Sequence, residues 1–109
     1  MKISDLKFDS AGLIPVVVQS ASDNKVLMVA YMSLQSLELS LVSGQTHFFS
    51  RSRGEIWHKG ASSGNTQDIV SVHADCDGDS LLVLVGSAGN ACHTGAVSCF
   101  DNYEPLEQK

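Results

Sequence analysis

The side chains best suited to chemistry are concentrated in residues 75–99. This segment contains all three cysteines of the 109-residue chain, Cys76, Cys92 and Cys99, together with His93. Three thiolates fill three corners of a zinc tetrahedron, and a site with three protein ligands leaves the fourth position to water, as in catalytic zinc sites. We therefore predict that the three cysteines bind zinc. The alternative is that Cys76 is a buried core thiol and the other two are incidental neighbours, because free cysteines are among the most buried residues.

Three aspartates, Asp75, Asp77 and Asp79, surround the first of these cysteines. The pattern begins like a calcium loop, but an EF-hand has glycine at its sixth position and glutamate at its twelfth, where this chain has Ser80 and Gly86. The EF-hand interpretation therefore fails. A looser Mg²⁺ site remains open, since hard divalent cations bind carboxylates, water and substrate phosphates. The alternative is a solvated acidic turn.

His93 differs from the other histidines because it directly follows Cys92. Imidazole titrates near neutral pH and can accept and return a proton beside a metal site. We therefore predict that His93 is a catalytic acid–base residue. The remaining three, His47, His58 and His73, are expected to be structural histidines.

A second chemical segment contains positive charge and small residues. Two arginines alternate with serines over 50–53, and a lysine precedes the loop 60–65. Guanidinium groups pair with phosphate oxygens, and small side chains let backbone amides approach an anion, so we predict phosphate binding here. Solvated surface charge is the alternative, and the aromatic side chains near it could stack on a base or pack in the core. The predicted substrate-binding residues are Ser50, Arg51, Ser52, Arg53, Trp57, Lys59, Ser62, Ser63 and Gly64.

The elements that must position these side chains are short. Ser33 is a typical helix N-cap and Gly44 a typical C-terminal residue, which predicts a helix over about 33–43, although the alternation of leucines there also fits a strand. A mostly β or α+β domain follows. The expected strands, which pair as three hairpins, are 15–19 with 25–31, 45–51 with 55–58, and 69–76 with 81–85.

The predicted strand 69–76 carries both kinds of metal ligand. Because side chains alternate along a strand, Val70, Val72, Ala74 and Cys76 are expected on one side, with Asp75 and its acidic neighbour at position 77 on the other. A regular strand would therefore separate the thiol from the acids.

The composition excludes several classes of function. The formal net charge is −5 and the pI about 5.1, without a sustained basic face, which argues against nucleic acid as a principal partner. The first ten residues lack the apolar core of a secretory signal, and the longest apolar runs, 14–18 and 81–85, are too short to span a bilayer. We expect a single domain over 1–109 in the cytoplasm, where disulfides are disfavoured, with no membrane partner.

Several ordered blocks of the chain resemble phosphoribosyl-AMP cyclohydrolase of histidine biosynthesis, in its monofunctional form. The similarity extends from about residue 25 to residue 100, and we expect no fused pyrophosphohydrolase domain. The blocks are 47–60, 63–67, 75–79, 91–95 and 98–100.

The resemblance implies a zinc-dependent hydrolase that opens the N1–C6 bond of the adenine ring of 1-(5-phosphoribosyl)-AMP. It implies an intertwined, mostly β homodimer with one Zn²⁺ per subunit, bound by cysteines of both protomers at positions 76, 92 and 99. It also implies Mg²⁺ on the aspartates at 75, 77 and 79.

Two segments depart from the family pattern. Ala96 and Val97 stand where relatives often have a basic pair, and Ala61 and Ser62 replace a loop segment that commonly ends in threonine. Two other functions remain open: a dimer stapled by zinc without turnover, in which a fourth ligand closes the metal to solvent, and a phosphate-ligand binding module without chemistry.

Overall fold

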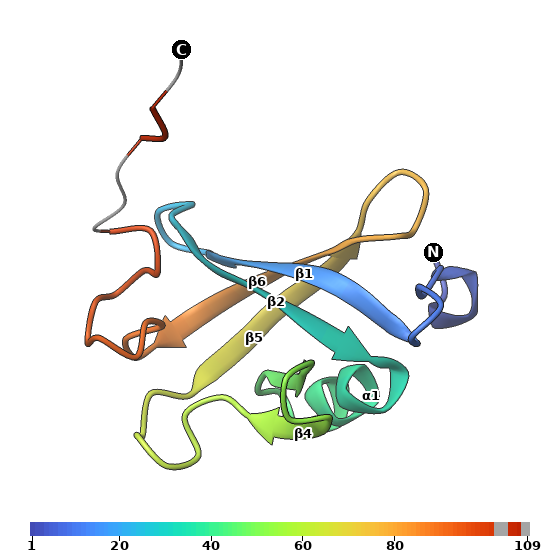
Figure 1. The fold of residues 1–109 in the computed structure, drawn as a ribbon, viewed down its shortest axis with the longest axis horizontal. Helices are drawn as coiled ribbons and strands as arrows, with labels where there is room; N and C mark the ends of the chain where they lie inside the picture. The colour runs from blue at the N-terminus through green and yellow to red at the C-terminus, as the bar shows by residue number, and fades with distance from the viewer. Residues whose placement is uncertain (102–104, 108–109) are drawn as a thin grey trace.

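The computed structural model describes residues 1–101 and 105–107, and in this part of the chain it contains six strands and one α-helix (Figure 1). This confirms the predicted α+β class. The elements are the 3₁₀ helix η1 (Ile3–Asp5), β1 (Leu13–Ser20), β2 (Val26–Ser33), α1 (Leu34–Ser43), β3 (His47–Ser50), β4 (Glu55–His58), β5 (Gln67–Ala74) and β6 (Leu81–Ala88).

Four strands form one sheet in the order β2-β1-β6-β5, and β3 and β4 form a separate hairpin. All three predicted hairpins are confirmed: β1 with β2, β3 with β4, and β5 with β6 are antiparallel pairs. The central pair, β1 and β6, is parallel. One face of the sheet carries the fully buried Val16, Val18 and Val83, which pack with Leu37 of α1 and Phe48 of β3 in the core.

The helix α1 begins and ends where the sequence predicts. The Ser33 hydroxyl accepts a hydrogen bond from the Ser36 N–H at 3.1 Å, and the Ser36 hydroxyl accepts one from the Ser33 N–H at 2.9 Å. Gly44 ends the helix in the left-handed conformation, with φ of 76°. Leu37 is buried whereas Leu39 is exposed, so the helix is confirmed over the alternating strand.

The predicted strand 69–76 is wrong in two respects. First, the register of β5 and β6 shifts between Ile69 and Ser71, which leaves Val70 as an extra residue in a β-bulge. The Val70 side chain is therefore 61% exposed, while Ile69 and Val72 pack against the core. Second, β5 ends at Ala74, so the cysteine and the acids that follow lie in a turn and no pleat separates them.

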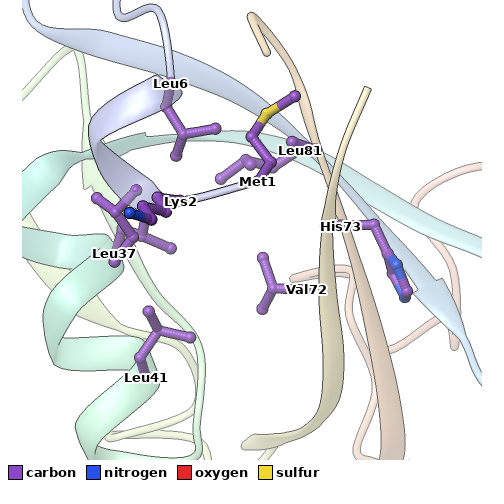
Figure 2. A pocket seen from close by; sticks show the side chains of 10 residues that line it. Met1, Lys2, Leu6, Leu37, Leu41, Val72, His73 and Leu81 are labelled. Atoms are coloured by element: carbon purple, nitrogen blue, oxygen red, sulfur yellow. The ribbon is translucent and has the colours of Figure 1, made fainter. Parts of the chain in front are cut away.

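A pocket of about 390 Å³ lies between η1, α1 and β5. Figure 2 shows Leu6, Leu37 and Leu41 facing Val72 across it, with His73 on the opposite side of β5. None of the predicted site residues lines this pocket. None of the helices in the described residues has the length and hydrophobicity of a membrane-spanning segment.

Candidate active site

A cleft of about 870 Å³ lies between the β3–β4 hairpin, the loop that follows β4, and the segment that follows β6. These three parts of the chain contribute most of the side chains that the sequence marks as chemical. The predicted site residues that line the cleft are Ser50, Ser52, Arg53, Trp57, Lys59, Ser62, Ser63, Cys92, His93 and Cys99.

The segment 89–101, which carries two of the cysteines, is fixed to the start of β2. The N–H of Cys99 donates to the carbonyl of Leu27 at 2.8 Å, and the Ser98 hydroxyl donates to the carbonyl of Val26 at 2.6 Å. Lys25 and Asp101 form an ion pair beside these contacts. The segment is therefore held at both its backbone and its side chains.

Cys92 and Cys99 lie close enough for their thiols to interact, and their pKa values move in opposite directions. The Thr94 hydroxyl donates to Cys92 Sγ at 3.0 Å, and this bond, with the Thr94 N–H, lowers the pKa of Cys92. Desolvation, followed by the charge on Cys92, raises the pKa of Cys99, while Lys59 opposes that rise. Two adjacent thiolates are therefore unfavourable without a cation, which is the chemistry of a soft metal site.

Cys76 lies elsewhere, in the turn between β5 and β6, at the opposite end of the sheet from the segment 89–101 (Figure 1). One chain thus brings together two of the three predicted zinc ligands, Cys92 and Cys99, and not the third. The exposure of Cys76 excludes the alternative that it is a buried core thiol.

The three aspartates of the β5–β6 turn form a compact group, with one oxygen of each within 4.8 Å of the others. Asp75 Oδ1 accepts from the N–H groups of Asp79 at 3.0 Å and of Ser80 at 3.2 Å. Hydrogen bonds with Asp77 and Asp75 raise the pKa of Asp79. Desolvation alone would raise the pKa of Asp75, but its hydrogen bonds with Asp79 and Ser80 together lower it. Carboxylates that compete for a proton in this way fit a hard divalent cation.

The two arginines of the β3–β4 turn have different surroundings. Arg53 lines the cleft, whereas the guanidinium of Arg51 lies 4.0 Å above the ring of Tyr31 in β2. Neither Arg51 nor Gly64 is among the residues that line the cleft. Lys59 does line it and is 8% exposed, with its Nζ donating to the carbonyl of Asn90 at 3.4 Å.

Sequence reasoning missed Asn65 and Asn90, which also line the cleft. A signal was present in the neighbouring glycines. A Cβ on Gly60 would lie 2.2 Å from the carbonyl carbon of Asn65, and one on Gly89 would lie 2.3 Å from Asn65 Oδ1. The loop after β4 and the segment after β6 therefore touch at Asn65, through positions where only glycine fits.

His58 also lines the cleft, although it was predicted to be structural. Its Nε2 lies 2.8 Å from Gln45 Oε1, and its ring stacks on that of His47 with 4.5 Å between centroids. These contacts confirm a structural role at the edge of the cleft.

The comparisons with known proteins agree with this geometry. The phosphoribosyl-AMP cyclohydrolase family model matches residues 28–101, which includes both cysteine-bearing segments and the whole cleft. The chain belongs to the phosphoribosyl-AMP cyclohydrolase family. The family resemblance predicted from the sequence is thus confirmed.

Two groups of relatives share the cyclohydrolase segment. A phosphoribosyl-AMP cyclohydrolase of Lactiplantibacillus plantarum is 58% identical over 97 residues, which cover 89% of this chain and 90% of the relative. The histidine biosynthesis bifunctional protein HisIE of Caldanaerobacter subterraneus is 57% identical over 98 residues, which cover 90% of this chain and 48% of the relative. The chain therefore spans about half the length of such bifunctional relatives.

Proposed function

We propose that this chain catalyses the hydrolytic opening of the N1–C6 bond of the adenine ring of 1-(5-phosphoribosyl)-AMP. The product is the opened imidazole carboxamide intermediate of histidine biosynthesis. The observation that carries the proposal is one cleft that combines the thiol pair Cys92 and Cys99, the imidazole of His93 and cationic side chains. The chain is also 58% identical to a phosphoribosyl-AMP cyclohydrolase of nearly matching length.

The thiol pair supports a zinc site shared between two copies of the chain. Cys92 and Cys99 supply two ligands, and we infer that Cys76 of the partner subunit supplies the third, because the β5–β6 turn of the same chain lies at the far end of the sheet. In a two-fold dimer the exchange is reciprocal, which gives two such sites. Three protein ligands leave a position for water.

When bound, the zinc ion would supply Lewis acidity and lower the pKa of its bound water toward neutrality. His93, exposed on the wall of the cleft, accepts the proton of the attacking water and returns it to the departing N1 nitrogen. Water adds at C6, which is electron-poor because N1 carries a phosphoribosyl group, and the N1–C6 bond then breaks.

Several other residues of the cleft bind and orient the substrate. Arg53, with the serine hydroxyls at 50, 52, 62 and 63, provides donors for a phosphate, and Trp57 provides a face for the purine. Cys76 lies between Asp75 and Asp77 in sequence. A β5–β6 turn that donates the Cys76 thiol to the partner's zinc site therefore also brings its aspartates to the partner's cleft. That acidic group would hold Mg²⁺, whose charge would offset that of the second phosphate.

The decisive experiment incubates the purified, reduced protein with 1-(5-phosphoribosyl)-AMP, with and without a zinc chelator, and follows the purine absorbance. We expect conversion that the chelator abolishes and that added Zn²⁺ restores. Loss of dimer on chelation, without conversion in either case, would support the zinc-stapled dimer instead. Substrate binding without conversion and without dependence on the chelator would support the phosphate-ligand module.

A further inference from the structure

Lys59 is the one charged side chain that is buried among the residues that the structure describes, with 8% of its surface exposed. It directly follows β4, and its N–H donates to the carbonyl of Thr46 at 3.1 Å, which fixes its backbone to the start of β3. Burial of an ammonium is unfavourable unless negative charge lies nearby. The position of Lys59 therefore favours an anion in the cleft.

The protein itself supplies little of that negative charge in the described residues. The only acceptor that Lys59 Nζ reaches there is the carbonyl of Asn90, at 3.4 Å, and the ion pair found in the same residues joins Lys25 to Asp101 instead. Two sources of negative charge remain, a phosphate of the substrate and the thiolates that line the same cleft.

The contact with Asn90 favours the thiolates. Asn90 lies two residues before Cys92, at the start of the segment whose other end is fixed to β2 through the N–H of Cys99. Lys59 thus adds a side-chain contact at the start of this segment, beside the hydrogen bond from the Gly89 N–H to the Thr66 carbonyl at 3.3 Å. In addition, three thiolates on one Zn²⁺ leave a net negative charge, which a buried ammonium in the same cleft offsets.

We propose that Lys59 is a positioning residue for the thiol pair rather than a phosphate contact: its ammonium fixes the Asn90 carbonyl, and with it Cys92, and its charge offsets that of the thiolate site. The inference rests on the proposed zinc site and deepens it. Lys59 acts through the cysteines and need not touch the substrate.

The test measures zinc affinity and steady-state kinetics on the same preparations of the full-length protein. Zinc affinity is obtained by competition with a chromophoric chelator for the wild type, Lys59→Met, Lys59→Arg and the control Lys7→Met, an exposed lysine outside the cleft. We expect Lys59→Met to bind zinc about 10- to 100-fold more weakly, with its KM within about threefold of the wild type once zinc is saturating. Lys59→Arg should recover part of the affinity because it keeps the charge, and Lys7→Met should match the wild type.

The outcomes separate this inference from the proposed function. Unchanged zinc affinity with a KM raised about tenfold or more in Lys59→Met would make Lys59 a phosphate contact and overturn the inference. If zinc affinity and KM are both unchanged in Lys59→Met, the inference about Lys59 is overturned as well. In either case the proposed function stands as long as the wild type binds zinc and is active. A wild type that binds no zinc would refute the proposed function and the inference together. If Lys59→Met does not fold, Lys59→Arg still decides the question: a changed zinc affinity supports the positioning role, and a changed KM supports a phosphate contact.

Discussion

Arg51 and Arg53 lie two residues apart, yet their guanidinium groups have different surroundings. Arg51 stacks on Tyr31 at 4.0 Å, a cation–π contact that occupies it, whereas Arg53 lines the cleft. We expect Arg53→Ala to raise the KM for 1-(5-phosphoribosyl)-AMP about tenfold or more, since it removes a charge-assisted hydrogen bond. Arg51→Ala should raise it less than about threefold. Steady-state kinetics at saturating zinc measure both, and the reverse order would contradict the assignment.

His93 is the proposed proton carrier, and its removal should affect turnover rather than metal binding. We expect His93→Ala to lower kcat by about 10²–10⁴ while zinc content per subunit stays at the wild-type value. His73→Ala is the matched control, because His73 is exposed on β5, away from the cleft, and hydrogen-bonds Ser71 at 2.8 Å. Full activity of His93→Ala would remove the assignment, and lost zinc would make His93 a ligand.

At the scale of single residues, the sequence identifies which side chains are suited to chemistry but not which way those side chains point. The cysteines, the acids and His93 stand out by density, and the basic turn by composition. The division between Arg51 and Arg53 depends on the turn 51–54, which is closed by a hydrogen bond from the Gly54 N–H to the Ser50 carbonyl at 2.8 Å. Which side chain such a turn directs inward follows from backbone dihedral angles, which composition does not determine.

At the scale of elements, the pair Lys25–Asp101 is expected to stabilise the segment 89–101 in a pH-dependent way. The hydrogen bond from Lys25, and then that from the Ser98 N–H, lowers the pKa of Asp101 below its ordinary value of 3.8. A carboxyl whose pKa is lowered by folding adds stability above its unfolded pKa and loses it as the pH falls through the folded one. Asp101→Asn should therefore reduce the melting temperature at pH 7 slightly, and the difference should shrink as the pH falls below 3.8.

Thermal melts of the metal-free protein at pH 7, 5 and 3 measure this difference without interference from ligand protonation. Glu38→Gln is the control, because Glu38 is an exposed carboxyl on α1. Its melting temperature should follow that of the wild type at each pH. A deficit of Asp101→Asn that was as large at pH 3 as at pH 7 would contradict an ionic contribution.

Caps and turns made the elements predictable, and tertiary contacts limited that prediction. Ser33 and Gly44 bound α1 by local hydrogen bonds, so the sequence could locate it. The bulge at Val70 could not be located, because it adjusts the register of two strands. The position of the segment 89–101 could not be predicted either, because it depends on a hydrogen bond from Ser98 to Val26, a residue 72 positions away.

At the scale of the whole molecule, a shared zinc site predicts complementation between two inactive variants. Cys76→Ser and Cys92→Ser should each abolish activity as homodimers. In a heterodimer of the two, one site combines both defects and the other has all its cysteines intact, so about half of the wild-type activity should return. Co-expression with two different affinity tags, followed by tandem purification, yields the heterodimer for assay.

The matched control pairs Cys92→Ser with Cys99→Ser. Because these two cysteines lie in one segment of the same chain, each site of that heterodimer keeps one defect, and it should stay inactive. Inactivity of the Cys76→Ser with Cys92→Ser heterodimer as well would show that all three ligands come from a single chain. The spacing of the cysteines could not distinguish these arrangements, because it does not show that the β5–β6 turn lies at the far end of the sheet; only the family resemblance implied both protomers.

The parallel pairing of β1 with β6 also has a consequence for biosynthesis of the chain. Val16 pairs with Leu81 and Ser20 with Val85, so the middle of the sheet joins strands that are synthesised far apart in time. Until β6 leaves the ribosome, the hairpin of β1 and β2 has an open edge bearing Val16 and Val18, which are fully buried in the finished fold. Nascent chains that stall before residue 81 are therefore expected to be aggregation-prone and dependent on chaperones.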